Sequence, residues 1–343
     1  MSERLSDGFL GCFLGGAVGD ALGAPVEFLP LDEIRRKFGP AGITGYVEFW
    51  SGQGAFTDDT QMALFTAEGL ILGGKPESVH RSYLRWLLTQ GQEPNWARAR
   101  TTEASLRSEG WLIKEKGLWA QRSPGMTCLA ALRSGRSGTT ADPINVSKGC
   151  GGVMRAAPAG LWGRDPEEAF RMGCEIAAIT HGSASGYLPA GFLASMIAVL
   201  KWGGGLEESI ERSTAILKGW NGHGESLAAI ERALQPAGPD PAADIGNLSG
   251  KSGGPAPGGG GTADQALAIA VYCALRHPND FRGGVLAAVN HDGDSDSTAA
   301  IAGNILGARL GREGIPREWI TGLEMAAVVE RIALELFAAV NVL

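Results

Sequence analysis

The sequence lacks the patterns that mark several common classes of site. Its five cysteines are scattered singly, without a C-x-x-C pair, and its five histidines include no H-x-x-x-H pair. These spacings fit neither a zinc cage nor a disulfide framework, and a reducing cytoplasm is the simplest location. No stripe of lysine and arginine interleaved with aromatic residues is present, and the formal net charge is −7. Nucleic acid is therefore not expected as a partner.

Long hydrophobic runs are also scarce. The apolar stretch 8–19 follows Glu3 and Asp7, is rich in glycine and stops at Asp20, which does not fit the apolar core of a signal peptide. The longest uncharged run, 183–200, contains a proline, two glycines and three serines. A buried helix preceded by a loop explains this run better than a membrane span, and no membrane partner is expected.

Alternating strand patterns are almost absent. One short extended piece is expected at 43–47, but apolar residues otherwise recur at helical spacing. Because 44% of the residues are hydrophobic, we predict an all-α fold with a sizeable core, in a single domain over residues 1–343. The predicted helical segments are 62–72, 79–88, 167–179, 190–201, 206–217, 225–234, 264–276, 298–310 and 324–340.

Glycine is unusually common, with 52 residues in 343. Part of the excess lies in a Gly/Pro-rich tract with almost no apolar anchor. We predict that residues 235–262 form a flexible surface loop between two helices. The tract is not a domain boundary, because helices beyond Ala266 are needed to complete the core.

Two helix starts are rich in acid. The stretch 57–60 reads TDDT and the stretch 294–297 reads DSDS, each followed by an amphipathic segment. One carboxylate is enough to cap a helix, with a gain of roughly 0.3–1 kcal/mol. Additional buried acids repel one another unless a cation lies between them. Carboxylate and hydroxyl oxygens are the ligands that Mg²⁺ and Mn²⁺ prefer, so on spacing alone capping and metal binding both remain open.

A third feature is the small-residue segment that precedes Glu27. Residues 15–24 read GGAVGDALGA, which predicts a helix that packs tightly and ends in a Gly/Pro turn. The turn presents Glu27, which by itself is equally well explained as a surface acid at a helix end.

In this order, GDALG with Glu27, TDDT and GDSDST resemble the ADP-ribosylglycohydrolase family over about residues 5–310. The resemblance implies a compact all-α protein whose cleft holds two Mg²⁺ or Mn²⁺ ions that engage the hydroxyls of ADP-ribose. It implies catalytic roles for Glu27 and Asp59, with Glu27 handling the proton. Asp20 is expected to support the site and Asp292 to orient the ligands. The metal ligands that the resemblance implies are Thr57, Asp58, Asp59, Asp294, Asp296 and Ser297.

Two further segments resemble parts of the family that contact ADP-ribose. The stretch 147–155 resembles a glycine-rich loop before a helix, which suits a diphosphate, and 180–183 resembles a segment whose histidine contacts the ligand. Plain turn chemistry and a satisfied core histidine are the alternatives. The ligand-contacting residues that the resemblance implies are Gly149, Cys150, Gly151, Gly152, Met154 and His181.

The chain departs from the family pattern at two places. Many members have asparagine where Cys150 stands. Members often carry an aromatic residue before the helix that begins near Ala263, whereas 258–261 are glycines here. An adenine contact is then expected from another aromatic residue, such as Trp119 or Tyr187.

The resemblance implies a metal-dependent hydrolase that removes ADP-ribose from modified protein side chains. An ADP-ribosylated protein and ADP-ribose are the expected partners. At the position of Ser297, serine-type members usually have threonine, so the chain resembles the arginine-type members here. ADP-ribosyl-arginine is therefore the expected linkage. Two alternatives are a hydrolase of small ADP-ribosyl conjugates and a catalytically silent relative that binds ADP-ribose.

Overall fold

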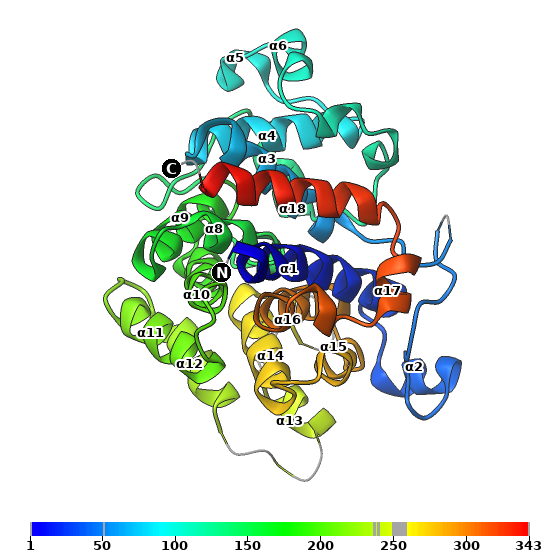
Figure 1. Cartoon of the computed structure of the whole chain (residues 1–343). Helices are drawn as coiled ribbons and strands as arrows, with labels where there is room; N and C mark the ends of the chain where they lie inside the picture. Colours follow the sequence, from blue (N-terminus) through cyan, green and yellow to red (C-terminus); the bar gives the residue numbers. More distant parts are fainter. Residues whose placement is uncertain (1, 51, 236–237, 239–240, 249–258, 342–343) are drawn as a thin grey trace.

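The computed structural model describes residues 2–50, 52–235, 238, 241–248 and 259–341 (Figure 1). Within these ranges no β-strand forms, and three isolated bridges are the extended pairings. The prediction of a single-domain, all-α fold is confirmed. The segment 43–47, expected to be extended, is irregular.

The helices follow one another along the chain with short connections. Their bounds are α1 (Ser2–Gly23), α2 (Leu31–Phe38), α3 (Asp58–Gly73), α4 (Pro76–Thr89), α5 (Trp96–Ala99), α6 (Glu103–Ser108), α7 (Met126–Arg133), α8 (Ala157–Trp162), α9 (Pro166–Ala178), α10 (Ala184–Leu200), α11 (Leu206–Lys218), α12 (Gly224–Ala233), α13 (Pro241–Leu248), α14 (Ala263–Arg276), α15 (Phe281–Val289), α16 (Ser295–Leu310), α17 (Arg317–Gly322) and α18 (Ala326–Val340). Short 3-10 turns are η1 (Ala24–Val26), η2 (Leu112–Lys114), η3 (Lys116–Leu118), η4 (Cys150–Gly152) and η5 (Arg312–Gly314).

Each of the nine helical segments predicted from the sequence falls on a helix. The largest difference is at α10, which begins at Ala184 rather than near 190 and contains Pro189. A proline in the second turn removes one main-chain hydrogen bond, but apolar burial along α10 keeps the helix continuous.

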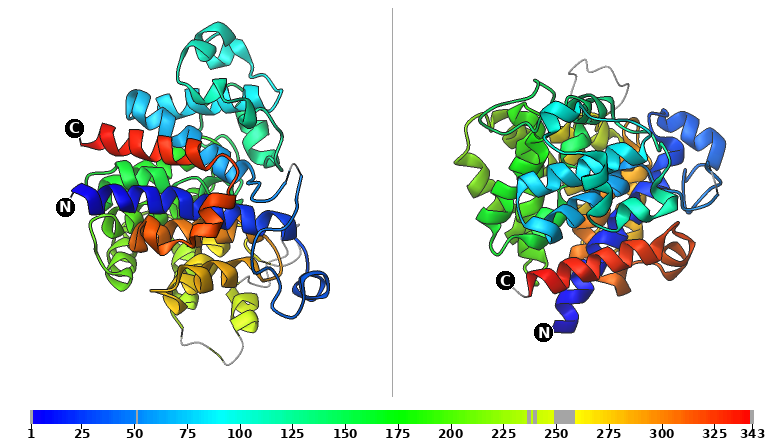
Figure 2. Two further views of the ribbon diagram at one scale, coloured as in Figure 1. Left: turned by 45° about the vertical axis from the view of Figure 1, so that its right-hand side comes forward. Right: turned by 90° about the horizontal axis from the view of Figure 1, so that it is seen from above.

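Helices α1 and α16 cross the centre of the molecule side by side and antiparallel (Figures 1 and 2). The contact side of α1 carries glycine at positions 11, 15, 19 and 23. A Cβ atom on Gly15 would lie 2.2 Å from the carbonyl oxygen of Gly303, and one on Gly23 would lie 2.4 Å from that of Ser295. The two backbones touch, so these positions require glycine. This packing brings the end of α1 against the start of α16.

The first helix, α1, is unusually apolar. Residues Leu5–Val26 are long and apolar enough to cross a membrane by length and composition, and 89% of the window is buried inside the protein. Such burial is typical of a core helix, in agreement with the glycine-lined contact with α16.

Part of the Gly/Pro-rich tract is helical. Helix α13 lies within it, and Asp244 in that helix accepts a hydrogen bond of 2.7 Å from the hydroxyl of Tyr272. Residues 259–262 pair with both the Gly149 and Gly293 loops. The flexibility predicted for 235–262 stays a prediction, and 236–237, 239–240 and 249–258 lie outside the described residues.

Candidate functional site

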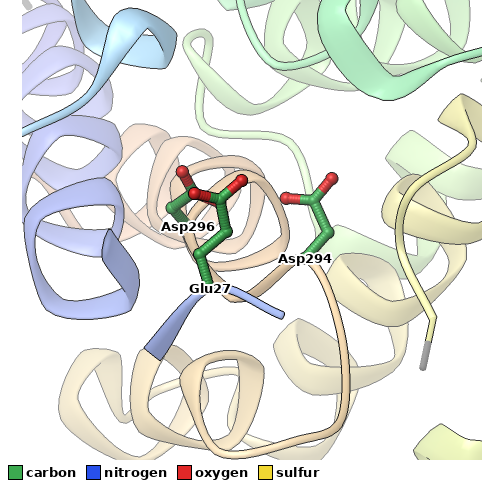
Figure 3. Close-up of side chains that lie close together, drawn as sticks. All are labelled: Glu27, Asp294 and Asp296. Carbon is green, nitrogen blue, oxygen red and sulfur yellow. The ribbon is translucent and has the colours of Figure 1, made fainter. Parts of the chain in front are cut away.

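Three carboxylates converge where α1 ends and α16 begins (Figure 3). Glu27, Asp294 and Asp296 each offer an oxygen, and these oxygens lie within 4.8 Å of one another. Asp294 is the N-cap of α16 and accepts from the main-chain N–H of Ser297 at 3.3 Å, while Asp296 accepts from the same N–H at 2.9 Å. Two of the three acids thus share one donor. Within the described part of the chain, one oxygen of each of the three acids converges on the others.

A tight turn positions Glu27. The main-chain N–H of Leu29 donates to the carbonyl of Val26 at 3.0 Å, and that of Phe28 donates to the carbonyl of Gly293 at 2.6 Å. Phe28 has a φ of 58°, a left-handed conformation that is costly for an aromatic residue. The bond to Gly293 ties this turn directly to the loop that precedes Asp294.

Asp20 holds the acidic start of α3. This fully buried carboxylate of α1 accepts from the N–H groups of Thr57 and Thr60 at 2.8 and 3.0 Å, and from the Thr60 hydroxyl at 2.5 Å. The hydroxyl of Thr57 in turn accepts from the N–H of Asp59 at 3.2 Å. Asp20 therefore caps α3 from outside, in the supporting role expected for it.

Asp58 and Asp59 are both buried at the start of α3, but they are bonded differently. Oδ2 of Asp58 accepts from the N–H of Gly125 at 3.1 Å. Oδ2 of Asp59 is buried without a hydrogen-bond partner. An orphaned carboxylate oxygen in the interior is costly, so it marks a place where a ligand is needed.

The carboxylates of the two helix starts act on one another. Burial raises the pKa of Glu27 to about 8, with a further rise from the charges of Asp294 and Asp58. Burial also raises the pKa of Asp58 to about 8. The pKa values of Asp59 and Asp296 rise well above the ordinary range, first because of burial and then because of neighbouring carboxylates. These mutual effects show that Glu27, Asp58, Asp59, Asp294 and Asp296 form one electrostatic cluster.

The glycine-rich loop closes one side of this cluster. The thiol of Cys150 donates to Oδ2 of Asp294 at 2.9 Å, and the hydroxyl of Ser297 lies 3.7 Å from the same sulfur. The N–H of Cys150 donates to the carbonyl of Gly261 at 3.3 Å, and that of Ala263 to Lys148 at 2.9 Å. The ordered end of the Gly/Pro tract thus joins this loop to the start of α16.

His181 and Met154 occupy more interior positions. His181 is buried, its Nδ1 lies 2.8 Å from the hydroxyl of Thr180, and burial lowers its pKa to about 3. Its ring faces the loop, since a Cβ atom on Gly151 would lie 3.3 Å from Nε2. Met154 is buried and lines an internal cavity of about 20 Å³ together with Asp59. Their proposed contacts with a ligand stay predictions.

Other expected residues lie at the edges of the site or elsewhere. The side chain of Asp292 accepts from the N–H of Leu31 at 2.5 Å and so anchors the start of α2. The indole of Trp119 donates to the carbonyl of Ile113 at 2.8 Å, and Tyr187 is partly buried in α10. An adenine contact by either aromatic residue stays a prediction.

Sequence reasoning missed two supports of the site. Arg155 is fully buried, donates to the hydroxyl of Thr180 at 2.7 Å and stacks over the Tyr83 ring at 4.4 Å. Its charge acts on Asp58. Gly125 binds the same carboxylate from a loop 67 residues away in sequence. Arg155 is the last residue of the glycine-rich stretch 147–155, so its position weakly indicated a role near the site. No pattern in the sequence indicated such a role for Gly125.

The residues present fit a divalent cation. The unpartnered Oδ2 of Asp59 and the converging oxygens of Glu27, Asp294 and Asp296 are hard ligands, which Mg²⁺ and Mn²⁺ prefer. A cation among these oxygens would offset the mutual repulsion of the buried carboxylates.

Comparison with known proteins identifies one family over almost the whole chain. The family model described as ADP-ribosylglycohydrolase matches residues 1–342. An ADP-ribosylarginine hydrolase (Tri1) of Pseudomonas putida is 26% identical over 340 residues, covering 98% of this chain and 79% of that protein. The ADP-ribosyl-[dinitrogen reductase] glycohydrolase of Rhodospirillum rubrum is 26% identical over 327 residues, covering 93% of this chain and 91% of that protein.

A solved structure gives the same result for the fold. The structure titled ADP-ribosylglycohydrolase-related protein complex superimposes with a TM-score of 0.67 at 26% identity, covering 98% of this chain and 99% of that chain. Sequence and fold therefore agree over almost the whole length. The chain belongs to the ADP-ribosylglycohydrolase family and is a glycosidic-bond hydrolase.

Proposed function

We propose that this chain hydrolyses the bond between ADP-ribose and a modified arginine side chain of a protein, with two Mg²⁺ or Mn²⁺ ions in the acidic cluster. The observation that carries the proposal is the convergence of Glu27, Asp294 and Asp296 in one cluster with the unpartnered oxygen of Asp59. The relatives named as an ADP-ribosylarginine hydrolase and as an ADP-ribosyl-[dinitrogen reductase] glycohydrolase support the substrate class.

Six residues would hold the ions. The carboxylates are charged ligands, and the hydroxyls of the two helix starts are neutral ones. When bound, the ions polarise oxygen ligands and bind the ribose hydroxyls. The proposed ligands are Thr57, Asp58, Asp59, Asp294, Asp296 and Ser297.

Glu27 is the proposed proton-handling residue. It is the cluster member on a turn rather than a helix, and its raised pKa lets the carboxyl hold or release a proton near neutral pH. In hydrolysis the bond from C1 of the distal ribose to the guanidine nitrogen breaks, and a bond from C1 to a water oxygen forms. Glu27 removes a proton from that water and passes it to the departing guanidine nitrogen, so charge and atoms balance.

The glycine-rich loop is the proposed diphosphate support. The turn from Gly149 to Gly152 offers backbone without bulky side chains at the start of η4, which suits phosphate oxygens. Its bonds to Gly261 and from Ala263 hold it rigidly beside the carboxylates. Rigid support of the remote part of a substrate aligns its reacting carbon.

The linkage is tested by offering the same protein three substrates with Mg²⁺ or Mn²⁺ present. These are an ADP-ribosyl-arginine peptide, an ADP-ribosyl-serine peptide of matched sequence and a small ADP-ribosyl conjugate. We expect release of ADP-ribose to be fastest from the arginine peptide. Faster release from the small conjugate would replace the proposal with a metabolite hydrolase. Binding of ADP-ribose without release from any of the three would indicate a silent relative.

A further inference from the structure

The thiol of Cys150 lies inside the acidic cluster rather than beside it. Its sulfur is 2.9 Å from Oδ2 of Asp294 and 3.7 Å from the hydroxyl of Ser297. The charges of Asp294 and Asp59 both act on it. The other four cysteines are buried, whereas Cys150 is partly exposed as a residue and directs its thiol toward the buried carboxylate of Asp294.

A second observation points to a ligand at the same place. Oδ2 of Asp59 is buried and has no hydrogen-bond partner in the described part of the chain, and the charge of Asp59 acts on the Cys150 thiol. The unpartnered oxygen and the thiol therefore belong to one cluster. A cation bound there would offset the cost of burying that oxygen without a partner.

The sulfur and the oxygen are near the separation of two ligands of one ion. Zinc binds thiolate sulfur at about 2.3 Å and carboxylate oxygen at about 2.0 Å in a tetrahedral arrangement, so two such ligands stand roughly 3.5 Å apart. The sulfur of Cys150 and Oδ2 of Asp294 lie 2.9 Å apart. The two atoms would have to separate by roughly half an ångström for the hydrogen bond to become joint coordination.

We propose that Cys150 is a metal ligand of this chain, so that its acidic cluster takes a thiophilic divalent cation such as Zn²⁺, Co²⁺ or Cd²⁺ jointly on Cys150 and Asp294. The inference rests on the proposed function in placing a cation in this cluster. A thiolate favours these ions over Mg²⁺. As the sulfur–metal bond forms, the thiol proton that now points to Asp294 leaves to solvent. No electron transfer is involved.

The test is direct metal binding to the full-length protein, before and after substitution of Cys150. Co²⁺ added to the chelated wild type is expected to give a thiolate-to-metal charge-transfer absorption band, which Cys150→Ser and Cys150→Asn lack. Calorimetric titration is expected to show Cd²⁺ affinity reduced at least about tenfold in both variants, with Mg²⁺ affinity changed much less. Cys273→Ala, which removes a buried thiol in α14, is the matched control and is expected to retain the band.

The outcomes separate this inference from the proposed function. An absent charge-transfer band in wild type, or equal Cd²⁺ affinity in wild type and Cys150→Ser, would overturn the ligand role of Cys150. Neither measurement needs turnover, so a protein that shows the band yet releases no ADP-ribose contradicts the proposed function alone. Circular dichroism of each variant confirms that a lost band does not reflect unfolding.

Discussion

Helix α3 buries two acidic side chains, Glu68 and Asp59, whose surroundings are opposite. Glu68, which is 2% exposed, accepts from five donors: Arg85 Nε at 3.0 Å and Nη2 at 2.7 Å, the Ser82 hydroxyl at 3.2 Å, and the N–H groups of Trp111 and Leu112 at 2.8 and 2.9 Å. Asp59, nine residues earlier and 3% exposed, leaves one oxygen without any partner.

The difference separates a structural acid from a functional one. The charge of Glu68 is offset by a buried arginine and by hydrogen bonds, so nothing further is needed. Burial raises the pKa of Asp59, and the carboxylates that it faces raise this pKa further. Burial of an acid is therefore not by itself a sign of function. The sign of function is a buried acid that has too few hydrogen-bond donors and too little positive charge around it to offset its own charge.

The largest expected effect is on turnover. Asp59→Asn and Asp296→Asn keep the shape of each side chain but remove a charged ligand. Each is expected to lower the rate of ADP-ribose release by roughly 10²–10⁴-fold, the range of a lost catalytic group. Asp280→Asn, which alters another helix-capping acid at α15, is the matched control and should keep near wild-type turnover. Near wild-type rates in the two cluster variants would remove the cluster from the reaction.

The next effect is on stability and concerns Glu68, the acid that is paired with Arg85. Arg85→Met leaves Glu68 buried without its cation and is expected to lower the free energy of unfolding by about 3–5 kcal/mol. Asp59→Asn is expected to leave the unfolding free energy of the chelated protein unchanged or higher, because it removes repulsion. Urea denaturation of both variants measures this. Equal destabilisation by both would erase the distinction between the two acids.

A further effect is the pH dependence of the chelated protein. The folded pKa values of Asp58 and Glu27, about 8, lie above their ordinary values of 3.8 and 4.5. Below about pH 4 both carboxyls are protonated in either state, so their contribution is fully present there and is lost as pH rises toward 8. The melting temperature should fall over this window, and added Mg²⁺ or Mn²⁺ should restore it most at the alkaline end. A melting temperature that rises with pH in the chelator would contradict this assignment.

The smallest effect tests how fully Glu68 is satisfied. Ser82→Ala removes one of its donors and is expected to cost about 1 kcal/mol of unfolding free energy, because Arg85 and two main-chain N–H groups still serve the carboxylate. Turnover should not change. A loss of turnover in this folded variant would connect Glu68 to the reaction and weaken the contrast with Asp59.

The sequence predicted the helices and the acidic motifs because both depend on local patterns. The apolar segments 62–72 and 298–310 predicted α3 and α16, and clustered acids stand out at the start of each helix. The sequence did not distinguish Asp59 from Glu68, because the groups that bind Glu68 are distant along the chain. Trp111, for example, is 43 residues away. Nor did it predict α13, since glycine and proline in the surrounding tract obscure a short helix whose burial depends on tertiary packing.

The contact between Cys150 and Asp294 was also beyond local reasoning. The two residues are 144 positions apart, and the close packing of α1 on α16 fixes Glu27 on the same cluster. Glycine spacing in α1 predicted close packing but not its partner. Long-range contacts of this kind require the fold.

We propose that the reaction requires divalent cations bound in the acidic cluster. The direct measurement is the initial rate of ADP-ribose release from an ADP-ribosyl-arginine peptide, after exhaustive chelation and then during titration with Mg²⁺ or Mn²⁺. Elemental analysis of the same sample confirms that metal has been removed. The rate is expected to fall to background and to recover saturably with either ion. Undiminished release from the metal-free protein would contradict the claim.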